Sequence, residues 1–241
     1  MRTFLVGVSL LFFALGVRAQ DLADASEYES AGMSYNTALN RGNLPATHGW
    51  ELGLEIGTRA FLGEYDHKAG FADWWALPAV DVFATYWMNR VVGLGFDVRY
   101  AAYKGQSIAG DTRAVFYSLS DELDEKTGFA RSTGSYMEIG GHGTVDLGKA
   151  FDGDPECRYR LLATVGLGEI IAVQSQHSSV AATAYFALKN QWRINSHWAA
   201  HLTLMGSIIP ERFDGKWGEQ EANNFPMDLT AGALLGASYR F

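Results

Sequence analysis

The sequence predicts an all-β fold, an eight-stranded antiparallel up-and-down transmembrane β-barrel, and three observations predict it. Apolar and polar residues alternate through one segment after another. The less apolar face of these segments is rich in glycine and carries charges of both signs. The connections alternate between short turns and long loops. Because a strand sends successive side chains to opposite faces, this pattern fits strands with lipid outside and a small polar lumen inside.

The alternating segments number eight, and none shows a helical period over ten residues. We expect strands at about Trp50–Gly63, Leu77–Met88, Val91–Lys104, Ser135–Gly148, Arg158–Val173, Val180–Ile194, Trp198–Ile209 and Leu229–Phe241. In the fifth segment Glu169 falls on the apolar face, where we expect a β-bulge or the edge of the membrane. Residues 105–133 are expected to form one long loop.

The N-terminus, MRTFLVGVSLLFFALGVRA, has the form of a secretory signal peptide. Arg2 supplies the positive region, and the apolar run from Phe4 to Val17 falls short of the ~20 residues of a membrane helix. We expect cleavage after Ala19. The predicted division of the chain is a signal peptide at 1–19, a flexible periplasmic lead at 20–49 and the barrel domain at 50–241.

Composition narrows the classes of protein that fit. Cleavage removes two arginines and no acidic residue, so the formal charge falls from −8 to −10. An acidic exported chain is a poor nucleic-acid binder, and no nucleic-acid partner is expected. A single cysteine, Cys157, excludes an intramolecular disulfide. Beyond the N-terminus no apolar stretch is long enough for a membrane helix, so a membrane-spanning form has to be a closed barrel.

The charges on the less apolar face nearly balance. A soluble barrel would turn them to water, whereas a narrow membrane barrel encloses them, where unpaired charges are costly. We therefore expect an ion-pair network in the lumen. Its predicted members are Glu51, Glu55, Arg59, Asp81, Asp97, Arg99, Glu138, His142, Asp146, Arg160, Lys189, Arg193, His201, Asp228 and Arg240.

Aromatic residues at strand ends on the apolar face indicate a membrane-interface girdle. The predicted girdle consists of Trp50, Tyr86, Tyr159, Trp192 and Trp198. The chain itself ends on an aromatic residue, in the alternating series Leu235, Ala237, Tyr239, Phe241.

With this ending, the predicted architecture resembles the OmpA/OmpX-type eight-stranded outer-membrane barrels of Gram-negative bacteria, over about Trp50 to Phe241. The resemblance implies an outer-membrane location among lipids and lipopolysaccharide. It also implies that the barrel-assembly machinery reads Leu235, Ala237, Tyr239 and Phe241 as an assembly signal. The chain has no room for the peptidoglycan-binding domain of OmpA.

Three functions remain open. The first is a non-enzymatic barrel with a filled lumen, acting in outer-membrane integrity or in surface interaction with an unknown ligand through its extracellular loops. The second is a small porin or ion-leak channel, although eight strands leave an interior that side chains just fill. The third is a lipid-modifying enzyme built on His142 and His201, with acids at Glu138 and Asp146 and hydroxyls at Thr144 and Thr203.

We favour the first function and expect no enzymatic activity, because no serine–histidine motif surrounds either histidine. The remaining histidines, among them His48, His67 and His177, are too scattered for a metal site, and we expect neither a metal nor a cofactor.

Overall fold

The computed structural model describes residues 48–62, 78–107, 115–123, 130–150, 158–210, 213 and 227–241. The predicted signal peptide and nearly all of the predicted lead lie outside these residues. The elements are β1 (Gly49–Leu62), β2 (Pro78–Trp87), β3 (Val92–Ser107), β4 (Tyr117–Leu123), β5 (Ala130–Asp146), α5 (Leu147–Ala150), β6 (Tyr159–Gln174), β7 (Val180–Arg193), β8 (Trp198–Pro210) and β9 (Met227–Arg240). In the described residues no helix has the length and apolar character to cross a membrane.

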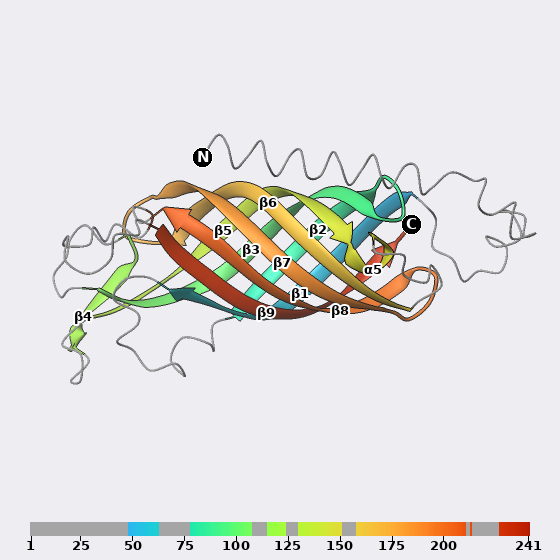
Figure 1. Cartoon of the computed structure of the whole chain (residues 1–241). Helices are drawn as coiled ribbons and strands as arrows, with labels where there is room; N and C mark the ends of the chain where they lie inside the picture. The colour runs from blue at the N-terminus through green and yellow to red at the C-terminus, as the bar shows by residue number, and fades with distance from the viewer. Residues whose placement is uncertain are drawn as a thin grey trace, which may run out of the picture.

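Eight of these strands close into one antiparallel barrel, and the predicted fold class is confirmed. The sheet runs β3-β2-β1-β9-β8-β7-β6-β5, and pairing between β3 and β5 closes it (Figure 1). The last strand, β9, pairs with the first, β1, along its length, with Glu51 opposite Arg240 and Leu62 opposite Leu229. Closure satisfies the backbone groups of both edge strands, which hydrocarbon could not do.

The two ends of the barrel differ. At one end, here the short-turn end, β2 joins β3 and β7 joins β8 through turns of four residues, 88–91 and 194–197. The same end holds α5, the start of β1 and the C-terminus (Figure 1). The opposite end, here the long-loop end, receives the long connections after β1, β3 and β8.

The barrel is polar inside and apolar outside. On β1 the residues Glu51, Glu55 and Arg59 are at most 3% exposed, whereas Leu54 and Ile56 between them are 53% and 60% exposed. The same alternation continues through the other seven barrel strands. Soluble proteins rarely expose a continuous apolar surface of this extent, and a transmembrane barrel requires one.

Two expectations need correction. The segment expected to be one long loop contains a ninth strand, β4, which pairs with the start of β5 and extends beyond the barrel wall (Figure 1). Of the two explanations expected for Glu169, a bulge or the membrane edge, the bulge is absent, since Glu169 stays in register with Ile139 on β5 and Ala182 on β7. The register instead shifts opposite Ser135 and Tyr136, so Glu169 is an outward carboxylate in a regular strand.

Candidate functional site: the charged lumen

The candidate site is the lumen, and its charged groups form layers along the barrel axis. The layer nearest the long-loop end is centred on Glu138 of β5, which is fully buried. Arg59 of β1 donates from Nη1 to Glu138 Oε2 at 2.6 Å, while Thr183 and Ser207 each donate to Oε1 at 2.9 Å. Arg59 also donates to Thr230 at 2.8 Å. Because Arg59 and Glu138 come from non-adjacent strands, this pair spans the lumen.

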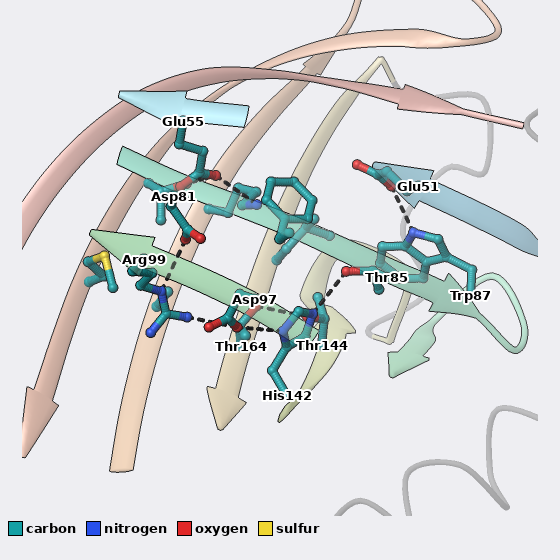
Figure 2. Close-up of a pocket in the computed structure, with 16 residues that line it drawn as sticks. Glu51, Glu55, Asp81, Thr85, Trp87, Asp97, Arg99, His142, Thr144 and Thr164 are labelled. Atoms are coloured by element: carbon teal, nitrogen blue, oxygen red, sulfur yellow. Dashed lines mark hydrogen bonds and ion pairs between the residues drawn. The ribbon is translucent and has the colours of Figure 1, made fainter. Parts of the chain in front are cut away.

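Arg99 of β3 links this layer to the middle of the barrel. It lies 3.1 Å from Asp81 and 2.9 Å from Asp97 (Figure 2). It also lies 3.4 Å from Glu138. Its guanidinium carbon also lies 3.7 Å from the centre of the Tyr185 ring. A rigid planar cation with five donors is suited to bridging several carboxylates in this way. One arginine therefore offsets charge from three strands.

A second group surrounds Glu55 of β1. Lys189 Nζ lies 2.8 Å from Glu55 Oε1, His201 Nδ1 lies 3.0 Å from the same oxygen, and Thr203 donates to it at 2.8 Å. Lys189 also lies 3.4 Å from the centre of the Phe83 ring. This cation is held between a carboxylate and an aromatic face, so its charge does not reach an open passage.

The layer at the short-turn end is built around Glu51 and Trp87. Trp87 donates its indole hydrogen to Glu51 at 2.7 Å, and Gln191 and Ser238 donate to the other carboxylate oxygen at 2.6 and 2.7 Å. Next to it, Arg160 donates to Asp146 at 2.7 Å and to Gln191 at 3.2 Å, with its guanidinium over the Trp87 ring. These groups form a layer across the barrel that separates the middle of the lumen from the short-turn end.

An aromatic cluster closes the long-loop end, and the sequence pattern did not predict it. Phe61, Tyr103 and Tyr136 come from barrel strands, and Phe116 and Phe213 come from the connections; all five are at most 1% exposed. The Tyr103 and Phe116 rings stack with their centres 3.8 Å apart, and Phe213 packs against Phe61, Phe116 and Tyr136. Nothing in an alternating strand pattern identifies a ring that reaches in from a loop.

His142 takes part in a hydroxyl–imidazole–carboxylate chain. Its Nδ1 lies 2.8 Å from Asp97 Oδ2, and its Nε2 lies 2.9 Å from Thr85 Oγ1 (Figure 2). The partners expected from the sequence, Glu138, Asp146 and Thr144, are therefore wrong for this histidine. For His201 the acid is Glu55, and Thr203 donates to that carboxylate. The order of groups around His142 is that of a catalytic triad. Whether it could act as one depends on whether a substrate can reach it.

The His142 chain is buried and borders only a small cavity. Asp97 also accepts a hydrogen bond from Tyr185 at 2.5 Å and pairs with Arg99. The adjoining cavity has a volume of about 30 Å³, which is room for about two water molecules. A lipid acyl group cannot enter that space. The chain orders the lumen and presents no exposed nucleophile.

The structure places every predicted lumen residue on the inner face. Ion pairs join Glu55, Arg59, Asp81, Asp97, Arg99, Glu138, His142, Asp146, Arg160, Lys189 and His201. Glu51 is held by neutral donors. Asp228 and Arg240 are buried on β9, and Arg193 is half-buried at the end of β7. Among the described residues no cluster of three or more His, Cys, Asp or Glu could hold a metal ion.

The predicted girdle residues are exposed, and all of them lie at the short-turn end. They meet in pairs across neighbouring strands, with ring centres 5.3 Å apart for Trp50 and Tyr86 and 6.0 Å apart for Tyr159 and Trp192. Trp198 packs against Tyr239 of the terminal strand, and Tyr239 packs against Phe241. Rings that pair at one level around the wall suit the boundary between hydrocarbon and water.

No family model and no curated protein matches the chain. Among solved structures, Neisserial surface protein A is similar at 10% identity and a TM-score of 0.47, covering 80% of this chain and 97% of that one. The N-terminal β-barrel domain of Pseudomonas aeruginosa OprF is 13% identical with a TM-score of 0.40, covering 80% and 99%. The outer membrane protein OprG of P. aeruginosa is 8% identical with a TM-score of 0.41, covering 82% and 98%. The chain's own closed sheet establishes an eight-stranded antiparallel β-barrel with a charged, layered lumen.

Proposed function

We propose that this chain is a non-enzymatic outer-membrane protein that acts in membrane integrity or surface interaction through its extracellular loops. The apolar wall and the aromatic girdle support insertion in a bilayer. The export signal and the resemblance to OmpA/OmpX-type barrels support the outer membrane of a Gram-negative bacterium, among lipids and lipopolysaccharide. In this orientation the short-turn end faces the periplasm and the long-loop end faces the outside.

The observation that carries the proposal is the closed lumen. A solute entering from outside meets the buried rings of Phe61, Phe116 and Phe213 and then the Arg59–Glu138 pair. From the other side it meets Glu51, Trp87 and Gln191. With side chains across its interior, the barrel offers solutes no continuous passage, and on the outside of the cell it presents only its wall and its loops.

A small pore is the second candidate, and one observation favours it. Glu51 lines both the central cavity and a second cavity at the short-turn end, so a single layer separates the two. Movement of the Trp87 and Gln191 side chains would join them. The aromatic cluster would still block the long-loop end.

Recording from purified protein in planar bilayers tests the proposal. The closed lumen predicts a flat current, with no resolved steps above the protein-free membrane. The matched comparison is the Phe116→Ala/Phe213→Ala double variant, which removes the rings contributed by the loops and leaves the Arg59–Glu138 pair in place. Resolved single-channel steps from the wild-type protein would contradict a closed platform and support the pore.

The enzyme alternative has its own test. If His142 or His201 served catalysis, His142→Ala or His201→Ala would change the mass spectrum of lipid A in cells that express the chain. The buried hydrogen bonds of His142 predict an unchanged spectrum. Loss of a lipid A species specific to the wild-type chain would overturn the non-enzymatic proposal.

A further inference from the structure

The short-turn end of the lumen holds a cavity whose charged lining residues are mainly cationic. Three arginines line it, Arg160, Arg193 and Arg240, against one carboxylate, Glu51. Polar residues of the 194–197 turn complete the wall. The cavity has a volume of about 20 Å³ and opens at the short-turn end of the barrel. An excess of guanidinium groups in a concave, partly dry space attracts anions.

Arg160 retains unused hydrogen-bonding capacity in this cavity. It is 7% exposed, and its Nε and Nη1 donate to Asp146 and Gln191. Its Nη2 is buried and has no hydrogen-bond partner among the described residues. A buried guanidinium nitrogen without an acceptor is costly, and an incoming oxygen would satisfy it.

The lining holds one carboxylate, Glu51, against three arginines. Both oxygens of Glu51 are taken by neutral donors, the Trp87 indole, the Gln191 amide and the Ser238 hydroxyl. Asp146 pairs with Arg160, and Lys149 of α5 lies 3.9 Å from the same carboxylate. Counted over the lining and the adjoining Asp146 and Lys149, four cationic groups stand against two carboxylates at this end.

The pKa of Lys149 is affected by these cations. Burial, together with repulsion from Arg160, Arg240 and Arg90, lowers the pKa of the Lys149 amine to about 7, against the attraction of Asp146. Burial makes the largest contribution to this lowered pKa, and repulsion from Arg160 adds to it.

We propose that the cavity at the short-turn end is a binding site for a phosphate anion, held by Arg160, Arg193 and Arg240. Guanidinium forks match the oxygens of a phosphate, and charge-assisted hydrogen bonds to it are strong. The ligand is either free inorganic phosphate or the headgroup phosphate of a phospholipid. That the cavity faces the periplasm rests on the proposed function, whereas binding itself does not.

The first experiment measures binding of inorganic phosphate to the detergent-purified barrel by calorimetry, in chloride buffer of matched ionic strength. Arg193→Gln, at the half-buried rim, and Arg160→Gln are each expected to weaken the affinity at least tenfold. The matched control is Arg158→Gln, which removes an exposed arginine beside the start of β6. Should Arg160→Gln fail to fold, Arg193→Gln still decides the outcome. No binding by the wild type, or equal binding by all four proteins, would overturn the proposal.

The second experiment separates the two sources of phosphate. Native mass spectrometry of the wild type with added phosphatidylglycerol would show a retained lipid that inorganic phosphate displaces, if the headgroup is the ligand. Binding of inorganic phosphate without lipid retention would identify the free ion. Both results support a phosphate site. Lipid that the Arg193→Gln variant retains equally is bound elsewhere on the wall, and it would count against the headgroup.

Discussion

At the scale of single residues, a side chain in this lumen depends on the space that its neighbours leave open. Gly166 shows this dependence, because a Cβ atom there would lie 2.1 Å from Cζ of Tyr185. Tyr185 needs that space to donate to Asp97. The Gly166 position therefore links strand composition directly to the hydrogen-bond network of the lumen.

Gly166→Ala should destabilise the barrel by about 1–3 kcal/mol, the usual cost of overpacking a filled interior. The matched control is Gly141→Ala, which adds a Cβ on the outer face with its nearest neighbour at 3.7 Å, an ordinary contact. Urea unfolding in detergent, followed by tryptophan fluorescence, measures both. Equal midpoints for the two variants would show that the Tyr185 ring has room to move.

Arg99 lies within ion-pair distance of three lumen carboxylates. Arg99→Glu would place a fourth carboxylate beside Asp81, Asp97 and Glu138, and losing one partner of a buried pair costs about 3–5 kcal/mol. We expect a lower temperature for the conversion from the folded to the unfolded band in gel electrophoresis. Arg158→Glu, an exposed reversal, should leave it unchanged. An unaltered transition in Arg99→Glu would mean that the ion pairs do not hold the barrel closed.

At the scale of elements, the loop segment before β4 is tied down at two points. Phe116 is buried in the aromatic cluster, and the Val115 carbonyl accepts hydrogen bonds from the Gln176 and His177 amides of the β6–β7 connection. A buried ring thus fixes one loop against another, and the end of the lumen closes as a consequence.

Phe116→Ala should free this segment without unfolding the barrel. We expect the Gln176 amide, which donates to Val115 at 2.7 Å, to exchange its hydrogen at least tenfold faster. Tyr117→Ala is the control, because the adjacent Tyr117 ring is 49% exposed and should matter little. Unchanged exchange at Gln176 in Phe116→Ala would show that the ring does not anchor the loop.

The terminal strand β9 combines a structural contact with a proposed assembly signal. Phe241 donates its amide to the Trp50 carbonyl at 2.9 Å, yet its ring is 64% exposed. Phe241→Ala should therefore leave the refolded barrel nearly as stable as the wild type. In cells we expect it to reduce the amount of folded barrel in the membrane several-fold. Wild-type amounts in cells would contradict a role of the terminal ring in assembly.

The inward and outward faces of the eight barrel strands could be predicted from the sequence because the side-chain period of a strand is fixed at two. The partners could not, because they depend on register and on which walls face each other. Asp97 meets His142 only because β3 and β5 pair with Gly95 opposite His142. Arg59 meets Glu138 across the lumen, a contact that closure alone creates. Phe116 and Phe213 carried no strand signal at all.

At the scale of the whole molecule, the fold is defined by which side of the wall faces water. Carboxylates and guanidinium groups lie enclosed, and aliphatic and aromatic side chains cover the outside. In water this distribution would be unfavourable twice, through buried charge and through exposed apolar surface. In a bilayer the wall meets hydrocarbon, which removes the cost of the exposed apolar surface. The cost of burying the charges is offset by their pairing with one another inside the barrel.

The most direct test of this account is fractionation followed by electrophoresis of boiled and unboiled samples. The account predicts that the chain is recovered in the outer-membrane fraction and that the unboiled protein runs as a separate, faster band that boiling abolishes. A chain recovered in the soluble periplasmic fraction, with the same mobility before and after boiling, would contradict a transmembrane barrel.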